Sequence, residues 1–202
     1  MERMAAPNGP TEGKILRPSD KKEPKTIAFV QCAGSRDENY LPYCSGICCL
    51  ASLKHTTYLR EQQPDCEVTI FFIDIRALDR LEDFYVKVQA DEKVAFIKSK
   101  IANITEDEET GNLILEGENT RTGEQILMNF DMVVLATGMV PNRIEIEPAP
   151  DVSYDEYGFL INNPEQPGIY GAGCVRRPTD VASSVQDATA GALKAIQSIA
   201  RR

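Results

Sequence analysis

The sequence has no tryptophan and a single histidine, His55, among its 202 residues. Histidine-based metal sites and nucleophilic triads therefore have few candidate residues in this chain. No apolar run approaches the roughly 20 residues that a membrane-spanning helix needs, and residues 1–10 lack the apolar core of a signal peptide. We therefore expect a cytoplasmic protein without a membrane span, in which thiols stay reduced.

Basic residues are scarce relative to acidic ones. The chain has 22 Lys and Arg residues against 31 Asp and Glu residues, which gives a formal net charge of −9. A general nucleic-acid-binding protein needs a basic face that displaces counterions from the phosphates, so this balance argues against that class. The composition, with 42% hydrophobic and 26% charged residues, is that of an ordinary globular protein.

Cysteine, by contrast, is concentrated in one stretch. Four of the six cysteines lie within residues 32–49, as Cys32, Cys44, Cys48 and Cys49. An apolar run at residues 27–30 predicts a buried strand over residues 27–31, and residues 45–63 have the pattern of a helix. The cysteines therefore occupy a turn that leads from a strand into a helix. In dinucleotide-binding folds this turn normally carries glycines and holds a pyrophosphate.

The spacing of these cysteines favours a metal site made of thiolates. Thiolates are soft ligands that prefer iron–sulfur clusters, zinc or copper(I). Cys44 and Cys48 are four residues apart and would share a helix face, and the helix N-terminus would direct N–H groups at an anionic cluster. The spacing matches neither the ferredoxin nor the zinc-ribbon pattern, so it does not select the metal. A redox-active thiol pair and plain packing of small residues stay open as alternatives.

Residues 67–138 continue the alternation of strands and helices. The patterns predict a strand at 67–74, a helix at 79–89, a strand at 94–104, short β runs at 113–116 and 126–130, and a buried strand at 132–138. Acidic and Thr-Gly turns between the short runs indicate an antiparallel meander. This order predicts an α/β fold with a Rossmann-like domain over residues 26–142. Residues 1–25, rich in proline, glycine and lysine, are interpreted as a linker or an extended surface segment.

Asp74 ends the second predicted strand, where the acidic residue of a Rossmann domain would bind a ribose hydroxyl. The preceding turn has Cys32-Ala-Gly34 in place of the glycine-rich motif, so a pyrophosphate would have no cradle. Nicotinamide binding is therefore disfavoured, and Asp74 is interpreted as a strand-end cap.

Residues 143–202 have a different organisation. The patterns predict a short strand at 157–161, a strand at 168–173 that ends in a glycine turn, and a helix at 179–200. Its apolar side chains are expected to face inward; they are Val185, Ala188, Leu193, Ile196 and Ile199. We interpret residues 143–202 as the tail of a second dinucleotide-binding domain whose first half is absent from the chain. The last helix would then be partly exposed, which favours association.

Two segments carry a resemblance to a known family. They are Ile-Ala-Phe-Val-Gln-Cys-Ala-Gly-Ser-Arg-Asp at residues 27–37 and Tyr-Cys-Ser-Gly-Ile-Cys-Cys at residues 43–49. Both resemble the signature of the heterodisulfide reductase A-subunit family, and residues 9–11 and 17–20 fit the same family. The resemblance covers nearly the whole chain as a C-terminal half. Within the family, the chain is most similar to the flavin subunit of the quinone-interacting membrane-bound oxidoreductase of sulfate reducers.

The resemblance implies a thioredoxin-reductase-like flavoprotein with FAD and a [4Fe-4S] cluster. The implied cluster ligands are Cys32, Cys44, Cys48 and Cys49. At residues 168–174 a strand ends in Ala-Gly-Cys where related flavoproteins have Ala-Gly-Asp, so Cys174 replaces the acid that holds the ribityl chain. Residues 143–202 would then be the C-terminal part of an FAD-binding domain, and FAD binding would need the missing N-terminal half. The residues expected to face the flavin are Thr137, Gly138, Gly171, Gly173, Cys174, Val181 and Ala182.

These expectations combine into a function. The resemblance implies an oxidoreductase subunit that relays electrons between FAD, the [4Fe-4S] cluster and other subunits of a membrane-associated complex. A soluble redox partner of the sulfate-reduction pathway would exchange electrons with it at the inner face of the membrane. No residue is predicted as a proton-transfer catalyst. The alternatives are a non-catalytic assembly module and a zinc-stabilised structural domain of the same fold.

Overall fold

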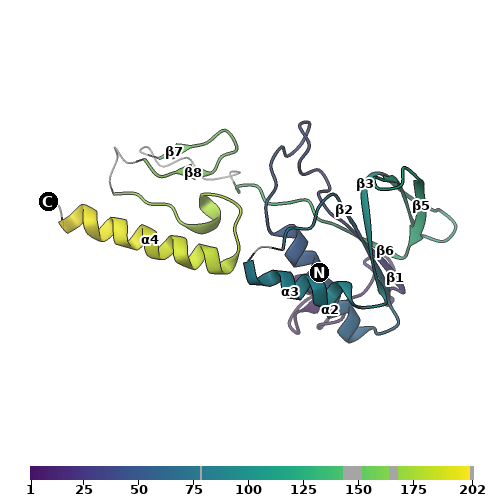
Figure 1. Ribbon diagram of the computed structural model, residues 1–202. Coiled ribbons are helices and arrows are strands. Elements are labelled where there is room, and N and C mark those ends of the chain that lie inside the picture. The colour runs from purple at the N-terminus through teal and green to yellow at the C-terminus, as the bar shows by residue number, and fades with distance from the viewer. Residues whose placement is uncertain (78, 143–151, 164–167, 201–202) are drawn as a thin grey trace. The chain divides into compact units, whose positions relative to one another are not determined.

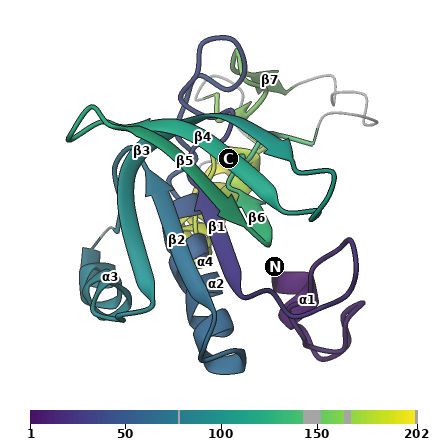
Figure 2. The ribbon, with the colours of Figure 1, turned by 90° about the vertical axis from the view of Figure 1, so that its right-hand side faces the viewer.

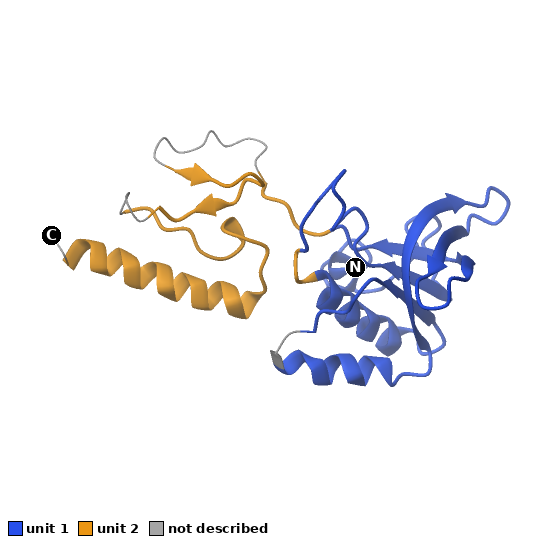
Figure 3. Ribbon diagram, turned by 45° about the horizontal axis from the view of Figure 1, so that its top comes forward, with its two compact units in different colours: residues 1–44, 48–137 blue, residues 45–47, 138–202 orange. Residues whose placement is uncertain are grey.

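A computed structural model describes residues 1–77, 79–142, 152–163 and 168–200. The chain divides into two compact units (Figure 3). Unit 1 comprises Met1–Cys44 and Cys48–Thr137, and unit 2 comprises Ser45–Ile47 and Gly138–Arg202. No helix in the described ranges is long and apolar enough to cross a membrane.

Unit 1 is built on one mixed six-stranded sheet in the order β5-β4-β3-β2-β1-β6 (Figure 2). Strands β3, β2, β1 and β6 run parallel, whereas β4 and β5 join β3 in an antiparallel meander. The strand bounds are β1 Thr26–Val30, β2 Glu67–Phe72, β3 Val94–Glu106, β4 Leu113–Asn119, β5 Gln125–Phe130 and β6 Met132–Leu135. The prediction of a Rossmann-like unit with a meander is therefore confirmed.

Two helical connections join the parallel strands (Figure 1). Helix α2 (Cys48–Gln62) links β1 to β2, and the 3-10 helix η1 (Asp79–Leu81) with helix α3 (Glu82–Gln89) links β2 to β3. The buried positions of α2 recur every three or four residues; they are Cys49, Ser52, Leu53, Thr56 and Leu59. This spacing places one face of α2 against the sheet.

Strand β3 takes part in both halves of the sheet. Its first residues pair with β2 and its last with β4, and the register shifts between Ile101 and Asn103. A bulge of this kind bends a strand and increases its twist.

Apolar clusters lie on both faces of the sheet. One contains Phe29 and Ile70 with residues of α2 and α3, and the other contains Phe71 with residues of β4 and β5.

Residues 1–25, which the sequence predicts as a linker or an extended segment, belong to unit 1 and pack on it. The segment includes the short helix α1 (Glu2–Ala5). The side chain of Ile15 is fully buried in the cluster beside α2. Its backbone N–H donates to Gln62 Oε1 at 3.1 Å, and its carbonyl accepts from Gln63 Nε2 at 2.9 Å. A single isoleucine among prolines and charges gives no periodic signal, so the packing could not be predicted.

Unit 2 contains the strands β7 (Ser153–Tyr154) and β8 (Leu160–Ile161), the 3-10 helix η2 (Gly173–Val175) and helix α4 (Val181–Ala200). The strand predicted at 157–161 is shortened to β8, which pairs antiparallel with β7. The strand predicted at 168–173 is wrong. Both backbone groups of Gly171 bond to the side chain of Asn162, so a side chain takes the place of a neighbouring strand.

Helix α4 forms as predicted, but the predicted inward orientation of its apolar side chains is wrong. No described residue of α4 is buried. Its exposed fractions are 62% at Val185, 56% at Leu193, 63% at Ile196 and 74% at Ile199. Ala188 is exposed as well. Hydrophobic periodicity predicts which side chains share a face, and it does not show that another element of the chain covers that face.

Candidate functional site

The four clustered cysteines lie where β1 leads into α2, as the sequence predicts. Cys32 follows the end of β1, Cys44 lies in the connecting loop, and Cys48 and Cys49 begin α2. Helix α2 starts three residues later than the prediction, at Cys48. This turn lies beyond the carboxyl end of a parallel strand, which is where open α/β sheets usually bind their ligands.

The backbone of the turn has an unusual conformation at its first cysteine. Cys32 has a φ of 56° and Arg36 a φ of 57°, both in the left-handed region that favours glycine. Hydrogen bonds to the turn after β6 hold this conformation. The N–H of Ala33 donates to Ala136 O at 3.1 Å, and Ser35 Oγ donates to Thr137 O at 2.7 Å. The predicted residue Thr137 is thereby brought beside the cysteine turn.

All six cysteines are described, and each is a thiol outside any disulfide. Burial raises the pKa of Cys32, partly offset by the nearby Arg36 guanidinium, and the neighbouring Cys44 raises it further. Burial also raises the pKa of Cys49, a backbone hydrogen bond from Arg76 lowers it, and the other three thiols of the turn raise it. Burial is thus the main cause of the raised pKa at both Cys32 and Cys49.

The four cysteines are suitable ligands for a thiolate-bound cluster, both in their chemistry and in their position at one turn. Four soft ligands come from a strand end, a loop and a helix N-terminus. Within the described ranges, no three His, Cys, Asp or Glu side chains already converge in a metal-binding arrangement. Cys49 Sγ instead lies 3.7 Å from the carbonyl oxygen of Asp74. The assignment of the four cysteines as ligands therefore stays a prediction.

Charged side chains accompany the thiols. Arg36 Nη1 donates to Asp74 Oδ1 at 2.8 Å, and Arg76 Nε lies 3.5 Å from the same oxygen. Asp74 thus joins two guanidinium groups near Cys32 and Cys49. The sequence predicted a strand-end cap for Asp74 and did not predict this ion pair, because the partners lie 38 residues apart.

Gln31 is a further residue of this site that sequence reasoning missed. It follows β1 directly and precedes Cys32. Its side chain is 4% exposed, and neither its amide nitrogen nor its amide oxygen has a hydrogen-bond partner among the described residues. A polar residue between an apolar strand and a cysteine was a signal that could have identified it.

The other predicted flavin-facing residues lie in unit 2, beginning with Gly138, which has a φ of 90°. The N–H of Gly171 donates to Asn162 Oδ1 at 2.7 Å, and the N–H of Gly173 donates to Asp187 Oδ2 at 2.9 Å. These amides therefore already have acceptors within the protein.

The start of α4 is also occupied by the protein's own groups. Asp180 Oδ1 accepts from the N–H of Ser183 at 2.8 Å, so a carboxylate caps the helix. Cys174 is exposed, with its sulfur 3.5 Å from the carbonyl of Thr179, and Val181 and Ala182 are exposed. The role of these residues toward a flavin stays a prediction.

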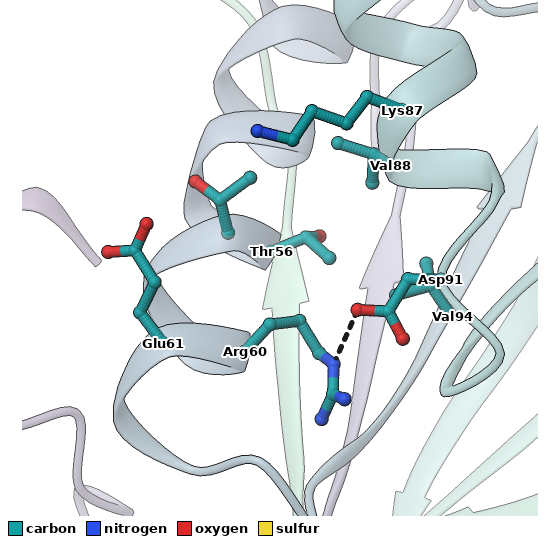
Figure 4. A pocket seen from close by; sticks show the side chains of 8 residues that line it. Thr56, Arg60, Glu61, Lys87, Val88, Asp91 and Val94 are labelled. Atoms are coloured by element: carbon teal, nitrogen blue, oxygen red, sulfur yellow. Dashed lines mark hydrogen bonds and ion pairs between the residues drawn. The ribbon is translucent and has the colours of Figure 1, made fainter.

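A separate cavity of about 280 Å³ lies between α2 and α3 (Figure 4). It is lined by Thr56, Thr57, Arg60, Glu61, Lys87, Val88, Asp91 and Val94. Arg60 Nε donates to Asp91 at 2.8 Å, and Arg60 Nη1 reaches the carbonyls of Gln63, Pro64 and Cys66. The guanidinium therefore joins the end of α2 to the segment after α3, and no predicted site residue lies here.

Comparison with known proteins identifies relatives along the whole chain. No family model matches the chain. An A-type iron-sulfur subunit of the CoB–CoM heterodisulfide reductase of Methanopyrus kandleri is 38% identical over 212 residues, which cover 99% of this chain and 32% of that protein. The A-subunit of the H2/formate:CoB-CoM heterodisulfide,ferredoxin reductase of Methanococcus maripaludis is 38% identical over 95% of this chain and 31% of its own length. This chain is a homologue of one segment of the heterodisulfide reductase A-subunit.

The chain spans about a third of the length of these heterodisulfide reductase subunits. The resemblance predicted from residues 27–37 and 43–49 is confirmed at the level of this subunit. Its placement in the C-terminal half, and the finer likeness to the quinone-interacting oxidoreductase of sulfate reducers, stay predictions.

Solved structures of thioredoxin reductases share the fold of this heterodisulfide reductase homologue. The enzyme of T. acidophilum superposes with a TM-score of 0.56 at 19% identity, over 86% of this chain and 52% of that chain. The Lactococcus lactis enzyme superposes with a TM-score of 0.54 at 19% identity, over 88% of this chain and 53% of that chain. The predicted thioredoxin-reductase-like fold is therefore confirmed.

Proposed function

We propose that this chain is the cluster-binding part of a heterodisulfide-reductase-like oxidoreductase subunit, which relays electrons between FAD, a [4Fe-4S] cluster and partner subunits. The observation that carries the proposal is the placement of four free cysteines at the one turn that leads from β1 into α2. The name of the Methanopyrus relative, an iron-sulfur subunit, supports the same choice of metal.

The residues of the turn have distinct roles in this proposal. Cys32 would bind from the strand end, Cys44 from the loop, and Cys48 with Cys49 from the first turn of α2. When bound, a [4Fe-4S] cluster supplies one-electron transfer. The backbone N–H groups at the start of α2 and the guanidinium groups of Arg36 and Arg76 would favour its negative charge.

FAD and the partner subunits belong to the proposal for the whole protein. The names of the relatives include heterodisulfide and ferredoxin reductases, which supports a place in a multi-subunit redox complex. A cytoplasmic location against the membrane through partner subunits, and a soluble partner in sulfate reduction, are parts of the same proposal. The amides of Gly171 and Gly173, which the sequence predicts to face a flavin, donate to Asn162 and Asp187, so we derive no step through FAD.

Metal analysis of the anaerobically purified chain tests the cluster. We expect about four iron and about four sulfide per chain, with broad visible absorption that bleaches when dithionite is added. One zinc per chain without visible absorption would favour the zinc-stabilised structural domain. A chain with neither metal nor colour after iron and sulfide reconstitution would favour the non-catalytic assembly module.

Substitution of one proposed ligand ties the signal to the turn. Cys48→Ser should lose most of the iron and the visible absorption, because a hydroxyl is a much poorer ligand for iron than a thiolate. Cys66→Ala is the matched control, since Cys66 is a buried thiol outside the turn. Equal iron content in both variants would contradict the assignment of Cys48.

A further inference from the structure

The side-chain amide of Gln31 is buried, and it forms no hydrogen bond with any described residue. The side chain is 4% exposed, and both Nε2 and Oε1 lack partners in the described ranges. The backbone of Gln31 is ordinary, since its N–H continues the β1–β2 pairing by donating to Phe71 O at 2.9 Å. A buried amide without partners opposes folding, because it loses its hydrogen bonds to water. We therefore expect the amide to form a hydrogen bond with a group that is not among the described residues.

The pleat of β1 fixes the side of the sheet on which this amide lies. Ile27 and Phe29 belong to the cluster packed with α2, whereas Ala28 and Val30 belong to the cluster on the opposite face. Since side chains alternate along a strand, Gln31 continues the series of Ile27 and Phe29. Its amide consequently lies on the α2 face of the sheet, at the end of β1 where the cysteine turn begins.

The buried thiol of Cys49 lies at the same end of that layer. Cys49 belongs to the buried face of α2, and its sulfur approaches the carbonyl of Asp74, just beyond the end of β2. Strands β1 and β2 are parallel neighbours, so their carboxyl ends share one edge of the sheet. The amide of Gln31 therefore lies on the face of the sheet that α2 covers, at the same edge as Cys49.

We propose that the Nε2–H group of Gln31 donates a hydrogen bond to a sulfur of the cluster bound by Cys32, Cys44, Cys48 and Cys49, and thereby raises its reduction potential. The inference rests on the proposed function. Hydrogen bonds to cluster or ligand sulfurs stabilise the more negative, reduced state and are one of the factors that set the potential. A glutamine amide supplies such a donor without adding a charge to the buried layer.

Ser99 provides a matched control for the effect of burial alone. Its hydroxyl is 2% exposed and, like the amide of Gln31, has no partner among the described residues. It lies on β3 between Ile97 and Ile101, which belong to the cluster on the face away from α2. Replacing Ser99 therefore removes an unpartnered polar group remote from the thiols.

The experiment compares Gln31→Met and Ser99→Ala in the full chain, first without metal and then loaded with iron and sulfide. In the metal-free protein both variants should raise the urea midpoint of unfolding, since each removes an unsatisfied buried group. In the loaded protein, Gln31→Met alone should shift the midpoint potential to a more negative value. We expect about a tenfold change in the ratio of oxidised to reduced cluster, equivalent to about 59 mV for one electron.

Two results would overturn the inference while leaving the proposed function intact. One is a loaded Gln31→Met variant with the potential of the unsubstituted chain. The other is a metal-free Gln31→Met variant that is less stable than the unsubstituted chain, which would show that the amide has a structural partner. A chain that binds no iron after reconstitution overturns the proposed function and the inference together.

Discussion

At the scale of single residues, Cys32 combines a strained backbone with a proposed metal ligand. Its φ of 56° is one that non-glycine residues adopt at a cost of roughly 1–2 kcal/mol. Strained residues of this kind persist where the surrounding structure holds them, and they concentrate at functional sites. Here the two hydrogen bonds to Ala136 and Thr137 hold the turn.

This strain predicts that glycine is the better residue for stability at position 32. The metal-free Cys32→Gly variant should be more stable than Cys32→Ala by about 1 kcal/mol, because both remove the thiol and only glycine relieves the backbone. Urea unfolding of the two metal-free variants measures the difference. A Cys32→Ala variant of equal or greater stability would show that the turn is not strained.

Cys66 predicts a pH dependence that is independent of the turn. Burial raises the pKa of its thiol to about 11, whereas an unfolded thiol has a pKa of about 8.5. Unfolding therefore releases a proton between these pH values, so the free energy of unfolding falls as pH rises through this window. The thiol should account for a loss of roughly 3 kcal/mol between pH 8 and pH 11.

Comparison with Cys66→Ala isolates this contribution. Urea midpoints of both proteins are measured from pH 8 to pH 11, where the titration of lysines and tyrosines affects both alike. The variant should lose less stability over this range. Parallel pH profiles would mean that the folded Cys66 thiol ionises normally.

The candidate site could be predicted from the sequence only where its residues are neighbours along the chain. The four cysteines are clustered within residues 32–49, and the structure places them at one turn as expected. The ion pair of Arg36 with Asp74 and the bond of Ser35 to Thr137 join residues 38 and 102 positions apart. Such contacts depend on strand order, and no local pattern in the sequence records them.

At the scale of elements, the end of α2 depends on Arg60. Its side chain bonds Asp91 and the carbonyls of Gln63 and Cys66, so it fixes the chain that leaves α2 against the segment after α3. Arg60→Met should destabilise the protein by about 2 kcal/mol, because hydrogen bonds to a charged group are lost while part of the apolar stem is kept.

The neighbouring exposed Glu61 serves as the control. Glu61→Gln should change stability by less than about 0.5 kcal/mol, as expected for a solvated surface residue. Thermal or urea unfolding of both variants gives the comparison. Similar effects in the two would indicate that the Arg60 contacts do not stabilise the helix end.

Helices and strands could be predicted from the sequence where the hydrophobic pattern fits only one kind of element. Strands β1 and β2 are short apolar runs because both of their faces are covered, and α2 shows periodic burial. The strand expected at 168–173 failed because glycine-rich apolar sequence fits an irregular segment equally well. The bond between Gly171 and the Asn162 side chain decided between them.

At the scale of the whole molecule, burial is distributed very unevenly. Both apolar clusters consist of residues of unit 1. Among the described residues of unit 2, Phe159 is the one large apolar side chain that is buried. The described residues of α4 are not buried, and the association that the sequence analysis expects from this exposure stays a prediction.

This distribution predicts unequal protection from hydrogen exchange. The amides of α4 should exchange much faster than those of β1 and β2, since a helix without buried contacts opens at low cost in free energy. Exchange followed by mass spectrometry on the isolated chain measures both segments together. Equal protection would show that α4 is covered in solution, for example by a second copy of the chain.

The hydrogen bonds from Ala33 and Ser35 to the turn after β6 also have a consequence for biosynthesis. During synthesis, all four clustered thiols are complete once Cys49 has been added, before β6 (Met132–Leu135) and the acceptor Thr137 have been made. Through that interval the thiols belong to an open loop that can capture any soft metal ion. If the protein is overproduced rapidly and contains a metal other than iron, the cause would be that translation is faster than cluster assembly. Slower synthesis should correct it without any change of sequence.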